Sequence, residues 1–290
     1  MSDPAQTYEA AERPSEDARL AAALWDTGGW EATNIAAAVV GPDGTLATIG
    51  PGDRSFRLAS VTKLLAAYAC LIAVEEGTLG LDEPTGPPGV TVRHLLAHAG
   101  GYGFDTDVLL LPERKRIYSN TGFDALADHL SHNAGMPAED YVQLAVFEPL
   151  RMRHTDLRGG SLAHGGWSTG ADLARFAIEL LRPTLVHPGT LAEATTVAYP
   201  DLAGILPGIG PQNPNDWGLG FEIKGYKTPH WTGRTNSPGT FGHFGASGSF
   251  LWVDPAISRS LLVLTDRNFG PWALDAWPPL ADAVVAAATT

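Results

Sequence analysis

The chain of 290 residues is 44% hydrophobic and 18% charged, so it can bury a sizeable core in one large domain or in two. Its 19 Lys and Arg residues and 32 Asp and Glu residues give a net charge of −13, which argues against nucleic acid and anionic lipid as main partners. Because Cys70 is the single cysteine, an internal disulfide and a cysteine-rich zinc site are excluded.

The beginning of the chain is acidic and carries no apolar run, whereas a secretory signal has a basic start followed by an apolar stretch. We therefore expect a cytoplasmic protein. The longest strongly apolar run, residues 64–74, is shorter than the roughly 20 residues that a membrane helix needs. We expect no transmembrane helix and no membrane partner.

The first part of the chain predicts a helix, a hairpin and a buried helix. Residues 15–25 have apolar side chains at helical spacing behind a capping Ser15. Residues 35–40 and 45–49 are β-rich and flank a Pro-Asp-Gly turn, which predicts an antiparallel hairpin, and a short strand is expected at 56–58. Residues 60–74 are apolar on every helical face, which is typical of a helix buried on all sides.

Two clusters of Pro and Gly lie at 84–89 and 207–214, and the region between them is predicted to be mostly helical. The expected helices there are 92–98, 122–133, 138–147, 172–182 and 191–197. After the second cluster we expect strands at 218–223, 249–253 and 260–265 and a closing helix at 272–288.

This order of elements predicts an α+β fold. Its antiparallel sheet is formed from the N- and C-terminal segments and flanked by helices, with a mostly helical insertion, since antiparallel strands can pair across long sequence distances. We expect a single domain over residues 15–288. Within it, residues 1–83 plus 212–290 form the α/β sheet subdomain and 84–211 form the helical subdomain.

The most informative fragment is residues 57–65, where Ser60 and Lys63 stand three apart on a predicted helix and so share a face. A serine hydroxyl is a weak nucleophile until a base takes its proton, and a desolvated lysine can be neutral enough to do so. The Ser-x-x-Lys pattern also arises by chance, and Lys63 could simply extend its ammonium from the helix start into solvent. However, Lys63 interrupts the most apolar helix of the chain, where an unpartnered ammonium is costly.

Two further fragments carry candidate site residues. In residues 117–122, the Tyr118 phenol could shuttle a proton and the Asn120 amide could hold a substrate carbonyl or orient the lysine, although such a pair is often an ordinary turn. Residues 241–249 place several glycines just before a strand. Glycine lets a ligand approach the backbone, so an N–H there could complete an oxyanion hole, and a simple bulge is the alternative.

In this order and spacing, the three fragments resemble the serine β-lactamase-related hydrolases, which include class C β-lactamases, D,D-carboxypeptidases, D-aminopeptidases and related esterases. The resemblance covers nearly the whole chain and implies the fold of the serine β-lactamases and penicillin-binding proteins. It extends to residues 91–101 (TVRHLLAHAGG), 147–150 (FEPL), 168–176 (STGADLARF) and 217–220 (WGLG).

The resemblance implies a role for each matched position. Ser60 is similar to the acylated nucleophile, Lys63 to its base partner and Tyr118 to the proton shuttle. The substrate-binding positions implied are Asn120, His243, Gly245 and Ala246, with the backbone N–H groups of Ser60 and Ala246 as oxyanion donors. An acyl-enzyme mechanism on a small-molecule ester or amide is implied as well, with no metal and no organic cofactor.

Two departures from the family pattern bear on the substrate. His243 and Phe244 replace the ammonium and the hydroxyl that hold the carboxylate of β-lactams and D-Ala peptides in relatives. We therefore expect an esterase-like serine hydrolase. β-Lactamase activity, D-amino-acid peptidase or amidase activity, and a catalytically inactive binding protein are the alternatives. The natural substrate, the acyl acceptor and the oligomeric state stay open.

Several other residues have competing interpretations. His94 and His98 have the spacing of a zinc pair, but the glutamate of an H-E-x-x-H motif is missing. No G-x-S-x-G elbow of an α/β-hydrolase occurs, and Cys70 is most simply a core residue. Aromatic side chains that could line an acyl pocket, although most aromatics are core, are Tyr102, Phe104, Trp217, Trp231 and Phe244.

Overall fold

The computed structural model describes residues 14–25 and 29–290. Its main sheet is antiparallel, with the strand order β2-β1-β12-β11-β10-β9. The strands are β1 (Ile35–Gly41), β2 (Gly44–Ile49), β9 (Glu222–Ile223), β10 (Phe241–Gly245), β11 (Ser249–Asp254) and β12 (Arg259–Thr265). The join between the two ends of the chain is the pairing of β1 with β12, in which Ile35 lies opposite Thr265. This confirms the predicted α+β fold with a sheet built from both ends of the sequence.

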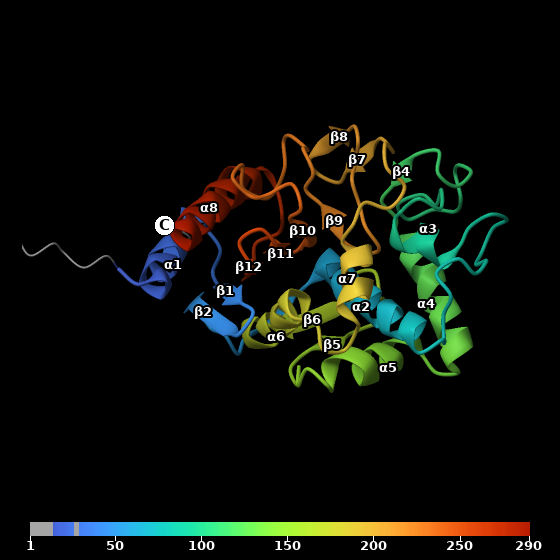
Figure 1. The fold of residues 1–290 in the computed structure, drawn as a ribbon, viewed down its shortest axis with the longest axis horizontal. Helices are drawn as coiled ribbons and strands as arrows, with labels where there is room; N and C mark the ends of the chain where they lie inside the picture. Colours follow the sequence, from blue (N-terminus) through green and yellow to red (C-terminus); the bar gives the residue numbers. More distant parts are fainter. Residues whose placement is uncertain (1–13, 26–28) are drawn as a thin grey trace, which may run out of the picture.

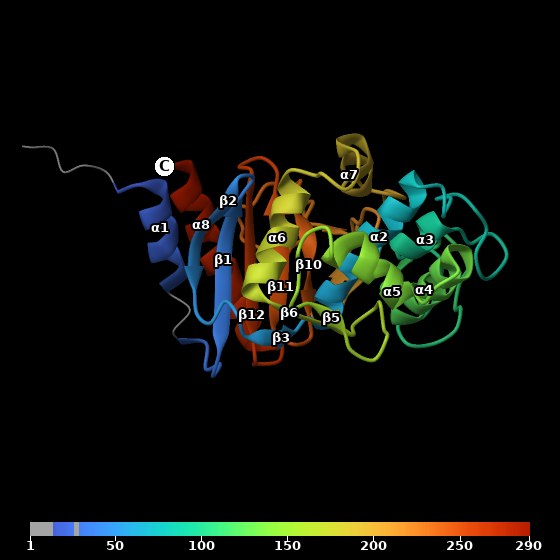
Figure 2. The ribbon, with the colours of Figure 1, turned by 90° about the horizontal axis from the view of Figure 1, so that it is seen from below.

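Apart from the partly exposed edge strand β2, the strands of this sheet are buried on both faces, and successive residues pack against different layers. Ala37, Val39 and Trp252 join a cluster with the first and last helices, α1 (Glu16–Leu24) and α8 (Pro271–Thr289). Their neighbours Ala38 and Leu251 join the larger core with the helices of the other face. Figures 1 and 2 show α1 and α8 side by side at one end of the molecule and α6 across the opposite face of the sheet.

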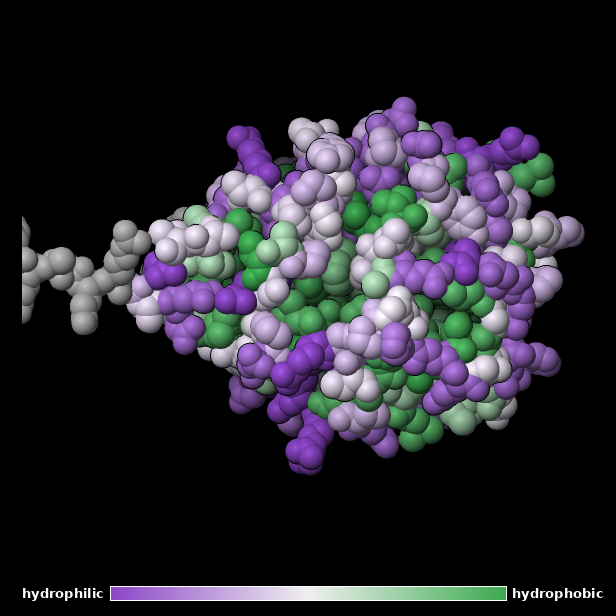
Figure 3. Space-filling model, viewed as in Figure 1, coloured by the Kyte–Doolittle hydropathy of each residue, from purple (hydrophilic) through white to green (hydrophobic). Residues whose placement is uncertain are grey.

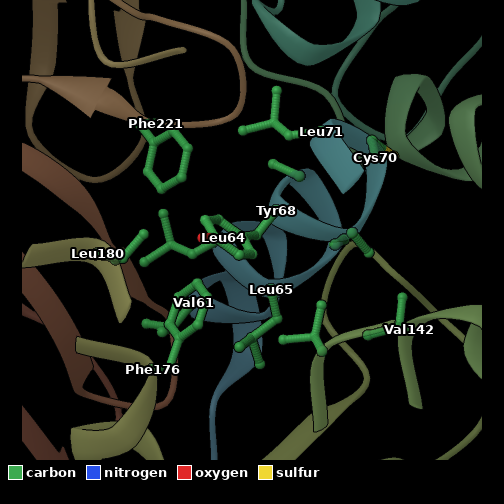
Figure 4. Packing of buried hydrophobic residues seen from close by; sticks show 14 of the residues in the cluster. Val61, Leu64, Leu65, Tyr68, Cys70, Leu71, Val142, Phe176, Leu180 and Phe221 are labelled. Carbon is green, nitrogen blue, oxygen red and sulfur yellow. The ribbon is translucent and has the colours of Figure 1, made fainter. Parts of the chain in front are cut away.

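The predicted first helix is confirmed, and the Oγ of Ser15 caps it by accepting the N–H of Ala18. The central helix α2 (Thr62–Glu75) is buried from Thr62 to Ala73, as its uniformly apolar sequence indicates. Leu64 and Tyr68 pack among Phe176 and Phe221 (Figure 4). This packing fixes α2, whose N-terminal end carries Ser60 and Lys63.

The remaining helices lie between the two halves of the sheet in sequence. They are α3 (Val92–Leu96), α4 (Asn120–Ala134), α5 (Ala138–Val142) continued by a π-helical turn (Gln143–Phe147), α6 (Gly170–Leu181) and α7 (Pro188–Ala194). The helices α4 and α7 begin earlier than predicted because Ser119 and His187 cap them with their side chains. The proposed division into two subdomains stays a prediction.

The chain also contains two small sheets of short strands, of which only the strand at Ser55–Arg57 was predicted, at 56–58. One small sheet has the order β3-β6-β5, from β3 (Ser55–Arg57), β6 (Gly166–Thr169) and β5 (Asp156–Leu157). Another has the order β4-β7-β8, from β4 (Arg116–Ile117), β7 (Gly204–Leu206) and β8 (Gly210–Gln212). Strands of two to four residues are too short to show a period-two pattern, so propensity alone does not identify them.

Two predictions about the strands near the glycine-rich fragment were wrong. The glycine-rich fragment was expected to precede a strand, yet Phe241–Gly245 is itself strand β10. Conversely, the strand expected at 218–223 is reduced to Glu222–Ile223. The glycines of β10 reflect close packing, because a Cβ on Gly242 would lie 2.1 Å from the carbonyl oxygen of Leu251 on the neighbouring strand.

The surface mixes polar and apolar residues on the face seen in Figure 3. In the part of the chain that the structure describes, no helix combines the length and the apolar character of a membrane span.

Candidate active site

Ser60 lies in a short 3-10 turn, Ala59–Val61, that leads directly into α2. Ala59 has a positive φ of 45°, a strained conformation for a residue with a side chain. The hydroxyl of Thr62 donates to the Ala59 carbonyl at 2.6 Å and accepts the N–H of Gly166 at 2.9 Å, which fixes the turn. Ser60 is half-buried at this point, where a helix begins at the edge of a cavity.

Lys63 is fully buried, so the alternative in which its ammonium reaches solvent is wrong. Its Nζ donates to Asn120 Oδ1 at 2.6 Å and to the Ala163 carbonyl at 2.9 Å. Burial lowers the pKa of Lys63 to about 7, although the carboxylates of Asp124 and Asp105 act in the opposite direction. A substantial fraction of the lysine is therefore neutral near pH 7.

Tyr118 sits between β4 and the first turn of α4, and Ser119 holds that junction. The Ser119 hydroxyl donates to the Gly103 carbonyl and accepts the N–H of Gly122. Burial raises the pKa of Tyr118 above its usual value, and a hydrogen bond with the Ser60 side chain acts against this increase. The Nζ of Lys63 lies 4.6 Å from the centre of the Tyr118 ring. The structure thus brings Ser60, Lys63 and Tyr118 together.

His243 reaches the same group from β10. Its Nδ1 accepts the N–H of Phe244 at 2.8 Å, and its Nε2 lies 3.2 Å from Tyr118 Oη. Burial, reinforced by the charge of Lys63, lowers the pKa of His243 to about 3, so the imidazole is neutral at pH 7. His243 therefore stands where relatives have an ammonium, but it does not supply a fixed positive charge.

Gly245 allows β10 to pass very close to the segment before Ser60. A Cβ at this position would lie 2.2 Å from the Leu58 carbonyl oxygen and 3.2 Å from Ala59 Cβ. The Ser249 hydroxyl donates to the same Leu58 carbonyl at 3.0 Å and closes the contact. The glycine thereby brings the exposed Ala246 to the cavity that Ser60 also lines.

This cavity has a volume of about 190 Å³. Ser60, Tyr118, His243 and Ala246 line it, whereas Lys63 and Asn120 lie behind its wall. Sequence reasoning missed three further lining residues, Pro207, Gly208 and Phe269. It also missed the Ala163 carbonyl on Lys63 and Asp105, whose Oδ1 accepts the Asn120 amide at 2.8 Å.

The five aromatic candidates divide between cavity and core. Phe104 and Phe244 line the cavity. Trp217 and Trp231 are almost fully buried, and Tyr102 lies in a separate small hollow beside His94 and His98. Phe244 packs its ring against those of Trp231, Phe269 and Trp277.

Both ring nitrogens of His94 and the Nδ1 of His98 have partners within the fold, whereas His98 Nε2 is buried without one. His94 Nδ1 contacts Thr91 and its Nε2 lies 3.0 Å from Glu113, while His98 Nδ1 accepts the N–H of Ser119. Within residues 14–25 and 29–290, no group of three or more His, Cys, Asp or Glu side chains could hold a metal ion. Cys70 is a buried core residue, and burial raises the pKa of its thiol to about 12.

Comparisons with known proteins place the chain in a family. The family model described as Beta-lactamase matches residues 11–286. A solved structure of a beta-lactamase from Mycobacterium bovis is 54% identical, with a TM-score of 0.91 over 92% of this chain and 100% of that one. Esterase EstB from Burkholderia gladioli is 24% identical over 75% of this chain and 78% of its own length. Penicillin-binding protein 4* from Bacillus subtilis is 26% identical over 50% of this chain, a match that spans 40% of that protein.

Proposed function

Because this chain belongs to the beta-lactamase family of serine hydrolases, we propose that it cleaves carboxylic esters through an acyl-enzyme formed on Ser60. One observation carries this proposal. A neutral His243, at the position where relatives have an ammonium, contacts Tyr118. The family membership supports hydrolysis, and the local chemistry around His243 supports an ester as the substrate.

The hydrogen bonds of Lys63 suit it to be the base. A neutral amine has two N–H groups and one lone pair. The two N–H groups are directed at Asn120 Oδ1 and the Ala163 carbonyl, which leaves the lone pair for the proton of Ser60 Oγ. In the first step, Ser60 Oγ attacks the ester carbonyl while Lys63 accepts its proton.

The tetrahedral intermediate carries a negative oxygen. We assign its stabilisation to the backbone N–H groups of Ser60 and Ala246, two residues that line the same cavity. Tyr118, whose ring centre lies 4.6 Å from Lys63 Nζ, then donates a proton to the departing alcohol and recovers one from Lys63. Water attacks the acyl-enzyme in the second half of the reaction, with the same groups acting in reverse.

The preference for an ester over a β-lactam follows from charge. Among the described residues, no lysine or arginine lines the cavity of about 190 Å³, and Lys63 is engaged behind its wall. His243 is neutral, and Phe244 places an aromatic ring where relatives have a hydroxyl. A substrate carboxylate would therefore lose its hydration without gaining a charged partner.

β-Lactam hydrolysis is the second candidate, because the Mycobacterium bovis relative is described as a beta-lactamase. We test the two by comparing kcat/KM for p-nitrophenyl acetate and for a chromogenic cephalosporin. The ester should be favoured by at least about tenfold, or about 1.4 kcal/mol of transition-state stabilisation. If the cephalosporin is the better substrate, the ester proposal is wrong.

An inactive binding protein is the non-enzyme alternative. Intact-protein mass spectrometry after treatment with a fluorophosphonate distinguishes it, because an active enzyme gains the reagent mass at one site. The Ser60→Ala variant should gain none, since it loses only its hydroxyl at the start of a helix. Stoichiometric labelling of Ser60→Ala would place the nucleophile elsewhere.

A further inference from the structure

A second hollow of about 530 Å³, which we call the apolar groove, lies beside the candidate active site. Its walls come from the loop before β4, from β4 itself and from the β7 region. The apolar residues that line it are Phe104, Leu109, Leu110, Ile117, Ile205 and Pro207.

The apolar groove exposes large hydrophobic side chains to solvent. Leu109 is 63% exposed, Ile205 61% and Phe104 48%. These side chains come from two segments about a hundred residues apart in sequence, yet they line one hollow. Scattered exposed apolar residues are ordinary, but a contiguous set in a concave site is typical of a ligand-binding surface.

Backbone hydrogen bonds tie the apolar groove to the catalytic residues. The N–H groups of Leu109 and Leu110 donate to the Gly101 carbonyl, and that of Asn120 donates to the Phe104 carbonyl at 2.7 Å. On the other wall, Ile205 pairs with Ile117, which immediately precedes Tyr118. Both walls are therefore fixed relative to Tyr118.

The two cations at the apolar groove have their charged groups bound to backbone carbonyls or in water. The Arg116 guanidinium donates to four carbonyls, those of Asn215, Ala97, Ala198 and Tyr199, and so has its hydrogen-bonding capacity used within the fold. Lys115 is exposed, and an exposed lysine keeps its ammonium in water while its alkyl stem covers apolar surface. A ligand in the groove therefore meets mainly hydrocarbon.

The apolar groove adjoins the catalytic cavity, because Phe104, Tyr118 and Pro207 line both. A carbonyl carbon next to Ser60 Oγ can therefore have its substituent in the groove. We propose that the groove is a subsite for an apolar chain of the ester substrate. This proposal rests on the proposed esterase function and adds the class of substrate.

The test measures kcat/KM along two series of esters, p-nitrophenyl alkanoates that vary the acyl chain and alkyl acetates that vary the alcohol. All are used below their micelle concentration, and each rate is divided by that for hydroxide-catalysed hydrolysis. In at least one series, kcat/KM should rise by at least about 30-fold between two and eight carbons, because each buried methylene contributes to binding. If neither series rises, the subsite proposal is wrong.

Two variants place the effect in the apolar groove. Ile205→Asp and, on the opposite wall, Leu109→Asp should each lower kcat/KM for the eight-carbon ester by at least about tenfold and leave the acetyl ester within about twofold. Leu144→Asp is the matched control, because Leu144 is 52% exposed and does not line the groove. If both groove variants keep the full chain-length gain, the proposal is overturned.

Binding without turnover separates this proposal from the esterase proposal. Titration of p-nitrophenyl octanoate into Ser60→Ala should give a lower Kd than p-nitrophenyl acetate, and Ile205→Asp in that background should remove the difference. If the acetyl ester is hydrolysed but chain length has no effect, the subsite proposal is wrong and the esterase proposal stands. If Ile205→Asp instead changes only the sedimentation coefficient, the patch is a contact between copies and the subsite proposal is wrong.

Discussion

His243 and Tyr118 face each other with 3.2 Å between Nε2 and Oη. Because the backbone N–H of Phe244 donates to His243 Nδ1, that nitrogen carries no proton and Nε2 must be the protonated one. His243 therefore donates to the Tyr118 oxygen, which leaves the phenol's own proton to be directed elsewhere. In the proposed mechanism that proton goes to the departing alcohol.

The first prediction concerns Lys63 and pH. If neutral Lys63 is the base, kcat/KM for an ester should rise with pH and level off, with an apparent pKa of about 7. Asp124→Asn removes a carboxylate that raises the pKa of Lys63, so the rise should move to lower pH by a fraction of a unit. Rate profiles from pH 5 to 9 at two ionic strengths measure the shift. A movement toward higher pH would contradict the assignment.

The second prediction concerns stability. The folded pKa of Lys63 is about 7, below the unfolded value of 10.5, so the unfolded chain binds the additional proton between these two pH values. The contribution of Lys63 to the free energy of unfolding should therefore increase as pH rises from 7 toward 10. Urea denaturation at pH 7 and pH 9 should show this increase in the wild type relative to Lys63→Met. Equal changes in the two proteins would show that the lysine is not desolvated.

The third prediction concerns the coupling of Lys63 and Tyr118. Lys63→Met and Tyr118→Phe should each lower kcat by at least about 10²-fold, the usual loss when general acid–base assistance is removed. Because the two side chains handle the same proton, the double variant should lose little more than either single one. If the two losses multiply fully, the residues do not act as a unit.

The fourth prediction concerns specificity. His243→Lys together with Phe244→Thr should shift the ratio of kcat/KM from the ester toward the cephalosporin, because it introduces a charge and a hydroxyl for the substrate carboxylate. The double substitution should also lower the stability of the fold, because it removes packing contacts. Phe244 contacts the rings of Trp231, Phe269 and Trp277, and truncating a buried aromatic typically destabilises by about 3–5 kcal/mol. Thermal unfolding should accompany the assay, with His243→Lys alone as the better-folded comparison.

The fifth prediction concerns Gly245. Gly245→Ala would place a Cβ 2.2 Å from the Leu58 carbonyl oxygen, so β10 must move away from the turn that carries Ser60. Ester turnover should fall by at least about 10²-fold, as expected when an oxyanion donor is displaced. Gly239→Ala is the control, since its Cβ would meet only ordinary contacts at 3.5 Å or more. If both variants keep full activity, β10 does not set the oxyanion geometry.

The sequence was sufficient for the parts of the site that depend on side-chain type and local spacing. Asn120 was one predicted partner of Lys63, and the two are hydrogen-bonded, while Ser60 lies in the 3-10 turn directly before the helix that carries Lys63. Long apolar segments such as α2 and β12 were predicted for the same reason, because burial leaves a periodic or continuous pattern. The chemical roles of these residues stay predictions.

The rest depends on tertiary contacts that no local pattern records. The carbonyl of Ala163 binds Lys63 through the backbone, so its side chain carries no signal of the contact. Gly242 and Gly245 resemble loop residues in the sequence because the reason for each glycine is a neighbouring carbonyl, that of Leu251 or Leu58, on another segment. The positive φ of Ala59 is likewise imposed by the packing around it.

The pairing of β1 with β12 has a consequence for the order of events during synthesis. Ile35 leaves the ribosome long before Thr265, its partner in the sheet. At roughly 5–20 residues per second, the edge of β1 waits on the order of ten seconds or more for the strand that covers it. During part of that interval Ser60, Lys63 and Tyr118 have been synthesised, but His243 and Ala246 have not yet been placed beside them. On the proposed mechanism, a nascent chain therefore cannot become acylated efficiently until the sheet closes. Its exposed β1 edge is the point at which aggregation or chaperone binding competes with folding.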